Sequence, residues 1–339
     1  MSFHFIYMEK QRYFFEILRT RIPDKYRLAE VVAEELKVST DSAYRRIRGE
    51  KELSFTELYT LSKKFSISVD EIFSYQSRQS AMFHYMPVDL SNQESYIAYI
   101  KRLLGTMTAF KSVPEKELYF SAQDIPFYHF LSFPELLFFK LYAWYDTLNR
   151  NSIPYSEFYN NLDRDAILPI YQQMAEAYQQ IPSKEIWTNQ TIDTILRLLE
   201  HYFETRAFEK KESVLLLVCQ LSELMNTVKK YADDACKGGN KKTPFHLFLC
   251  SVDLENNFML IKRGENMSCN IKLYTVNSIA TENKSLCMEM AKWFDDLISK
   301  SILISGTSTK ERLRFFQTSQ NKIDVLINKI ELSASHRAV

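Results

Sequence analysis

Glycine is scarce in this chain, with six residues among 339. Because glycine supplies the positive φ angles that hairpins and phosphate-binding loops need, its scarcity disfavours an all-β fold. The six glycines form no GxGxxG, GxxxxGK or GxSxG pattern, so the usual nucleotide-binding loops and the nucleophile elbow of hydrolases are excluded. We therefore expect a helix-rich protein without a cofactor, and nothing in the sequence indicates an enzyme.

Metal-ligand patterns and long hydrophobic runs are also absent. The six histidines show no HExxH spacing, and the five cysteines are scattered without a CxxC pair. We expect no metal site, and we interpret the cysteines as reduced core thiols of a cytoplasmic protein. The longest aliphatic run, residues 214–219, is too short to span a membrane, and residues 1–7 do not resemble a signal peptide. The sequence therefore predicts no membrane association.

The chain also lacks an excess of charge of one sign, since it has 43 Lys and Arg residues and 42 Asp and Glu residues. Any site for a polyanion must then be a local patch. Over residues 9–75 the basic residues outnumber the acidic ones by only one, but Arg45, Arg46, Arg48 and Lys51 lie close together. This cluster is the most basic feature of the N-terminal part.

Polar stretches near residues 74–94 and 235–244 divide the chain into three parts. The central part, residues 79–240, has apolar residues at helical spacing, which predicts an all-helical array. In residues 241–339, short apolar runs indicate a small antiparallel meander, followed by helical spacing. The predicted fold is therefore mainly α, with a small C-terminal α+β portion that is compatible with forming one unit with the central part.

The first part, residues 1–78, shows start and stop signals for five short helices. Ser39 is expected to cap the third helix, and Gly49 is expected to end it. The fourth and fifth helices each open with a capping box, in residues 54–57 and 68–71. These signals predict a small five-helix domain.

The second and third helices of this domain are joined only by residues 37–39. Since so short a turn does not allow antiparallel packing, the two helices must cross steeply, as in a helix-turn-helix. The third helix, residues 40–48, has small polar side chains at its start and three arginines toward its end. Short polar side chains let a helix enter the major groove, and arginine binds guanine or phosphate. The pattern predicts a DNA-reading helix.

The run VAEELKVSTDSAYRRIRGEKELSFTELYTLSKKFSISVDEIF resembles the five-helix domain of phage-repressor (Cro/C1, XRE-type) transcription regulators. The resemblance covers about a fifth of the chain. It implies that residues 39–42 and Arg45 contact bases and phosphates, and that Arg48 lies near the DNA backbone. With the neighbouring aromatic and basic residues, the candidate DNA-binding residues are Ser39, Thr40, Asp41, Ser42, Tyr44, Arg45, Arg46, Arg48 and Lys51.

Two departures from the family pattern affect the third helix. The turn residue is usually glycine but is Lys37 here. The apolar residue that points inward late in the helix is displaced by one position to Ile47, so that Arg46 stands where the family has this apolar residue. If Ile47 packs inward, Tyr44 is partly buried beside it, and Arg45, Arg48 and Asp41 face DNA. If Ile47 does not, Tyr44 faces a base.

From these features we expect a cytoplasmic, sequence-specific transcription regulator that binds double-stranded DNA as a homodimer. A single recognition helix covers only a few base pairs, so two copies on half-sites about 34 Å apart are needed for specificity. The domains would be a DNA-binding domain over residues 1–78, the helical region over 79–240 and an α+β region over 241–339. The last two would dimerise, respond to a small-molecule or protein effector, or both.

Alternatives remain open for the regions beyond the first domain. The closing helix near residues 310–330 is one candidate dimer seam, and folding back onto the meander is the other possibility. A protein adaptor with the helical array as its scaffold would be favoured by an open concave face. A regulator with vestigial enzyme ancestry would be supported by a polar-lined pocket near residues 250–269.

Overall fold

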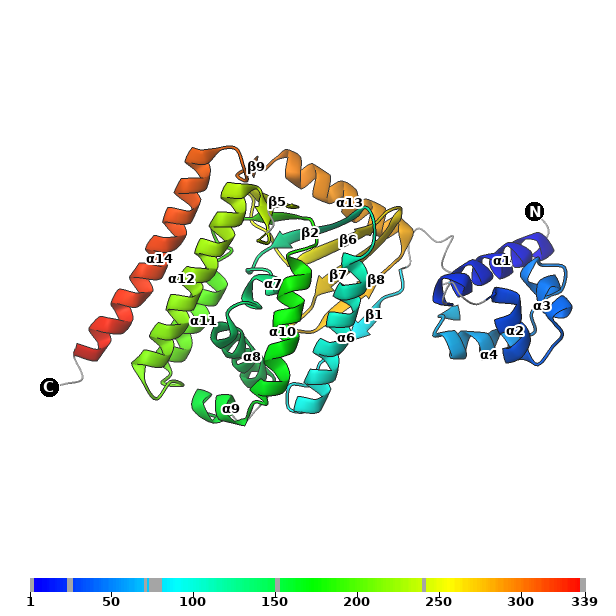
Figure 1. Ribbon diagram of the computed structural model, residues 1–339, viewed down its shortest axis with the longest axis horizontal. Helices are drawn as coiled ribbons and strands as arrows, with labels where there is room; N and C mark the ends of the chain where they lie inside the picture. The colour runs from blue at the N-terminus through cyan, green and yellow to red at the C-terminus, as the bar shows by residue number, and fades with distance from the viewer. Residues whose placement is uncertain are drawn as a thin grey trace. The chain divides into compact units, whose positions relative to one another are not determined.

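The computed structural model describes residues 3–22, 27–69, 72, 81–149, 153–239 and 242–335. The chain divides into two compact units, Met1–Met82 and Phe83–Val339. Figure 1 shows the first unit as a group of short helices and the second as a sheet covered by helices.

The helices described in the first unit are α1 (Phe3–Arg21), α2 (Leu28–Leu36), α3 (Thr40–Ile47) and α4 (Phe55–Phe65). The Ser39 hydroxyl accepts a hydrogen bond from the Ser42 N–H, and Ser54 and Glu57 form a reciprocal capping box. The N-caps predicted for these two helices are therefore confirmed. The capping box expected at residues 68–71 includes residues outside the described ones, as does the predicted fifth helix.

A small apolar core holds these helices together. Its buried members are Phe14, Phe15, Leu18, Ile22, Val32, Ala33, Ala43, Leu53, Leu61, Ile67 and Ile72. Each helix contributes side chains from one face, which is the pattern of an amphipathic helix in a small domain. Because α3 adds only the small Ala43 and the half-buried Ile47 to this core, much of its surface is available for other contacts.

The turn between α2 and α3 depends on a left-handed residue. Lys37 has φ 55° and ψ 45°, and the Val38 N–H donates to the Ala33 carbonyl at 3.0 Å. Gly49 ends α3 with φ 76°, as the sequence predicts. A lysine therefore occupies a backbone conformation that favours glycine.

Replacing Lys37 by glycine is expected to stabilise the turn. Left-handed backbone costs a side-chain-bearing residue about 1–2 kcal/mol, and the greater freedom of glycine in the unfolded chain offsets about half of that. The amides of α2 and α3 should gain about 0.5–1 kcal/mol of protection in hydrogen exchange. The control, Glu16→Gly in the exposed face of α1, should instead lose about 1 kcal/mol. Equal losses in both variants would contradict this explanation of the turn.

The second unit alternates helices and strands. Its elements up to β4 are β1 (His84–Met86), α6 (Gln93–Lys111), β2 (Lys116–Ala122), α7 (Phe127–Phe130), α8 (Pro134–Leu148), α9 (Tyr155–Asn161), α10 (Arg164–Tyr178), β3 (Ser183–Trp187), α11 (Asp193–Glu204), α12 (Lys211–Asp234) and β4 (Cys236–Lys237). They are followed by β5 (Thr243–Leu249), β6 (Phe258–Arg263), β7 (Asn266–Lys272), β8 (Ser278–Thr281), α13 (Lys284–Ser299), β9 (Ile302–Leu303) and α14 (Thr309–Ser335).

All the described strands of this unit belong to one mixed sheet. The order is β1-β8-β7-β6-β2-β3-β5-β4, and β9 pairs with β5 outside this path. β2, β3 and β5 are parallel and are connected through helices, whereas β6, β7, β8 and β1 are antiparallel. Parallel strands joined by helical crossovers are buried on both faces, which makes this sheet the centre of the unit.

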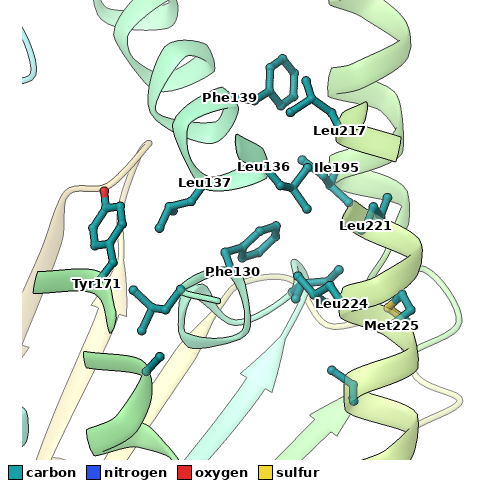
Figure 2. Packing of buried hydrophobic residues seen from close by; sticks show 14 of the residues in the cluster. Phe130, Leu136, Leu137, Phe139, Tyr171, Ile195, Leu217, Leu221, Leu224 and Met225 are labelled. Atoms are coloured by element: carbon teal, nitrogen blue, oxygen red, sulfur yellow. The ribbon is translucent and has the colours of Figure 1, made fainter. Parts of the chain in front are cut away.

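The two faces of the sheet carry separate cores. Leu118 and Ala122 of β2 pack with the helices α6 to α12 and α14, while the intervening Tyr119 packs with α13 on the other face. Successive side chains of a strand point to opposite faces, so the alternation follows directly from strand geometry. Figure 2 shows the larger core, where Phe139 of α8 points toward Leu217 of α12.

The expectation of a mainly α fold with an all-helical centre is wrong. β2 and β3 come from the central region, and β5 pairs with β3 instead of joining the meander of β6, β7 and β8. β2 (KELYFSA) and β3 (SKEIW) show neither a strict alternation of apolar and polar residues nor a continuous apolar run, so no local pattern indicates a strand in either segment. The central and C-terminal regions therefore share one sheet.

The closing helix also differs from its expected position. α14 lies beside α12, and its Phe316, Ile323 and Ile330 are buried in the larger core. The apolar face of this helix, which was a candidate dimer seam, is therefore buried within the chain. It packs on α12 and not on the meander. Leu313 of the same seam is exposed.

Two further expectations concern membranes and cysteines. No helix among the described residues combines the length and hydrophobicity needed to cross a bilayer. Cys250, Cys269 and Cys287 are buried and free, but Cys219 is exposed and Cys236 half-buried, so the interpretation of all five as core thiols is corrected.

Candidate nucleic-acid interface

Helix α3 turns one face to the core and the other to solvent. Ala43 and Arg46 are buried, whereas Asp41, Tyr44 and the arginines at 45 and 48 are exposed. The exposed residues recur at i, i+3, i+4 and i+7, which is the spacing of one helical face. Tyr44 is 44% exposed although Ile47 packs against the core, so the structure combines parts of both orientations considered from the sequence.

The structure distributes the nine candidate residues among three environments. The exposed ones are Ser39, Thr40, Asp41, Tyr44, Arg45, Arg48 and Lys51. Ser42 is half-buried and Arg46 is buried. The side chains of Arg45 and Arg48 are 54% and 59% exposed, so both guanidinium groups are available to a ligand.

Arg46 is fastened inside the unit. Its guanidinium donates to Glu57 Oε1 at 2.6 Å and to the carbonyl and hydroxyl oxygens of Ser42 at 3.0 and 2.6 Å. Burial alone would raise the pKa of the Glu57 carboxyl, but the bond and charge of Arg46 outweigh burial and lower that pKa below its ordinary value. The expectation that Arg46 contacts DNA is therefore corrected, because this residue joins α3 to α4.

Replacing Arg46 by methionine is expected to lower the free energy of unfolding by about 2 kcal/mol, because the Glu57 carboxylate loses its buried partner. The double variant Arg46→Met/Glu57→Gln should recover more than half of that loss, because no unpaired carboxylate remains and the glutamine amide oxygen can still accept from the Ser54 N–H. Urea unfolding of the full chain measures both. A double variant as unstable as the single one would show that the ion pair does not account for the burial of Arg46.

A buried amide fixes the connection between α3 and α4. Gln11 of α1 donates through Nε2 to the carbonyl oxygens of Arg46 and Lys51, both at 2.8 Å, and its Oε1 accepts from the Leu53 N–H at 2.8 Å. Together these three bonds hold both ends of the basic segment against α1. Gln11 is not among the candidate residues, and it precedes Arg12, where the sequence predicts that the first helix begins.

A second polar cluster lies inside the second unit and is centred on Glu185 of β3. Its carboxylate accepts from His129 Nε2 at 2.8 Å, Trp187 Nε1 at 3.0 Å and the Ser183 hydroxyl at 3.3 Å, as well as from the Tyr178 hydroxyl. Four donors around one carboxylate stabilise its negative charge inside the core. Glu185 is fully buried.

Lys237 of β4 adds a positive charge to this cluster. Its Nζ donates to the Ser183 hydroxyl at 2.9 Å and lies 3.4 Å from the centre of the Tyr178 ring. Burial lowers the pKa of Lys237 to about 7, against the opposing effect of Glu185. Burial would raise the pKa of Glu185, but the charges of His129 and Lys237 and the hydrogen bonds outweigh it and lower that pKa to about 2. Because all these residues are buried, we interpret the cluster as part of the core.

In the part of the chain that the structure describes, no three His, Cys, Asp or Glu side chains converge as metal ligands would. Cys250 and Cys269 bound the segment where a polar-lined pocket was considered, but both lie in the apolar core under α13. That alternative gains no support from the geometry.

Comparison of the chain with models of known protein families, with curated proteins and with solved structures finds no match. A proposed function therefore rests on the geometry of α3 and on the contacts of Arg46 and Gln11 that hold it.

Proposed function

We propose that this protein is a cytoplasmic transcription regulator that binds double-stranded DNA in a sequence-specific manner through α3. The observation that carries the proposal is the exposed row of Asp41, Tyr44, Arg45 and Arg48 on a short helix. The opposite face of that helix is fixed by the Arg46–Glu57 ion pair. A rigid helix with a free polar and basic face is what reading the major groove requires.

The exposed residues divide into two roles. Arg45 lies in the middle of the free face, where a guanidinium reaches base edges and binds guanine through two hydrogen bonds. Arg48 and Lys51 lie at the end of α3 and after it, where cations neutralise phosphates and fix the position of the helix. Base discrimination would then depend on Arg45, and most of the affinity on the phosphate contacts.

Two copies of the chain would act together, because one recognition helix covers only a few base pairs. The second unit, with its single large sheet, would supply the dimer contact, the response to an effector, or both. The alternative of a protein adaptor requires an open array of helices as its scaffold. The central helices instead cover a sheet, so the structure does not favour this alternative.

Titration of the full-length protein into a labelled random-sequence duplex at several salt concentrations tests the proposal. Binding should be measurable at low salt and should weaken with added salt, with a logarithmic slope of about 0.9 for each neutralised phosphate. Absence of binding at low salt, or binding without salt dependence, would contradict it.

A further inference from the structure

A single carboxylate lies between the two exposed arginines of the proposed DNA-binding face. Glu50 Oε1 is 3.2 Å from Arg48 Nε, and Glu50 Oε2 is 3.9 Å from Arg45 Nε. Each carboxylate oxygen therefore faces a different guanidinium. A phosphate group also presents several anionic oxygens to arginine, so the carboxylate is placed where a DNA phosphate would make the same contacts.

The backbone that carries Glu50 is held in place. Its N–H donates to the Arg45 carbonyl at 2.8 Å, and it follows Gly49, whose φ is 76°. The Gln11 side chain binds the carbonyl oxygens of Arg46 and Lys51 on either side of this turn. The backbone of the turn after α3 therefore determines that the Glu50 carboxylate lies between the two arginines.

We propose that Glu50 competes with DNA phosphates for Arg48, and for Arg45 wherever a random duplex offers it no matching base, and thereby keeps the affinity for random duplex low. This inference rests on the proposed function, because it concerns the same face of α3. In the free protein the carboxylate neutralises part of the positive charge of the two arginines. When DNA binds, a phosphate replaces the carboxylate, and the negative charge of Glu50 then lies beside the phosphate and opposes binding.

The effect has a defined size and a defined salt dependence. If Glu50 cancels about one positive charge, its removal adds about one neutralised phosphate to the complex. One added phosphate makes the plot of log affinity against log salt concentration steeper by about 0.9. If variant and wild type bind equally at 1 M salt, the variant then binds about eightfold more tightly at 0.1 M salt. The ion pairs are exposed, so the fold should not depend on them.

The variant Glu50→Gln removes the charge with little change in shape, and Glu16→Gln is its matched control. Glu16 is exposed on α1 and makes the same change in net charge. Full-length wild type and both variants are titrated into the same random-sequence duplex between low and moderate salt, and their thermal unfolding is measured in parallel. We expect Glu50→Gln to bind about eightfold more tightly at 0.1 M salt with a slope steeper by about 0.9. We expect Glu16→Gln to match the wild type and both melting temperatures to stay unchanged.

The other outcomes separate the two hypotheses. Equal affinities and slopes for the two variants, with DNA binding intact, would overturn the role of Glu50 alone. Weaker binding by Glu50→Gln would also overturn it, because the carboxylate would then be needed to orient the arginines. Failure of all three proteins to bind duplex at low salt would overturn the proposed function and this inference with it.

Discussion

The Arg45→Ala variant should bind a preferred duplex and a scrambled duplex with nearly the same affinity. Arg45 is the exposed guanidinium in the middle of the free face of α3, and a bidentate contact to a base edge accounts for about 1–3 kcal/mol of discrimination. Its removal should therefore reduce the ratio of the two affinities by about fivefold to 140-fold. The fold should persist, because the Arg45 side chain is half exposed and contributes no apolar surface to the core.

The measurement is a competition between the two duplexes for full-length protein, and Lys63→Ala is the control. Lys63 is exposed on α4, so its replacement removes one positive charge from the same unit without changing α3. The control should keep its preference for the selected duplex. Retained preference in Arg45→Ala would show that another residue reads the bases, and Tyr44 would be the next residue to test.

The Glu185→Leu variant should lose about 3–5 kcal/mol of unfolding free energy, the range for removing one partner of a buried charged network. The Lys237 side chain would lose the negative charge that raises its pKa, and it would remain in the core as a neutral amine. The donors of His129, Trp187 and Tyr178 would lose their acceptor. Urea unfolding at neutral pH measures the loss, and a change below 1 kcal/mol would contradict the central place of Glu185.

The Lys237→Met variant provides the comparison, and it should cost less than half as much as Glu185→Leu. Glu185 keeps its four donors in this variant, and the desolvation of the ammonium no longer opposes folding. Equal losses in both variants would mean that the ammonium is as necessary to the core as the carboxylate.

The same pair of charges predicts how stability depends on pH. The pKa of Lys237 is about 7 in the folded protein, below its ordinary value of 10.5, so the unfolded chain binds more protons between these values. The contribution of this group to stability should then rise as the pH increases from about 7 to 10.5. Glu185 acts at the acidic end of the pH range. Its lowered pKa stabilises the fold above pH 4.5, and this contribution to stability is lost as the pH falls toward 2. Lys237→Met should abolish the alkaline rise while keeping the acidic loss.

The sequence was sufficient for the local structure of the first unit. Ser39, Ser54 and Gly49 act within one helical turn of themselves, so their caps and stop signals could be read from neighbouring residues. The sequence left two orientations of α3 open, and it placed the buried Arg46 among the exposed residues. Local signals therefore predicted the caps of α3 and α4 and the end of α3, whereas contacts between α3 and DNA stay a prediction.

Contacts between residues far apart in the sequence could not be predicted in this way. The Arg46–Glu57 ion pair and the bonds of Gln11 connect residues separated by 11 to 42 positions. An arginine in a basic run resembles a DNA contact until its partner is known. Only the fold brings that partner to it.

The sheet of the second unit was missed for a related reason. β2 and β3 have seven and five residues; β2 lies between the long helix α6 and the four-residue helix α7, and β3 lies between α10 and α11. Glu185 also places a charge inside a strand, which is compatible with burial only because of the donors around it. Neither the length nor the apolar pattern of such a segment distinguishes a strand from part of a helix.

Selection of bound fragments from random duplex DNA by the full-length protein tests the central claim most directly. We expect an enriched sequence composed of two half-sites related by a dyad, with centres about 34 Å apart, because two copies of α3 would read neighbouring turns of the groove. Recovery of fragments without any enriched sequence would contradict sequence-specific DNA binding by this protein.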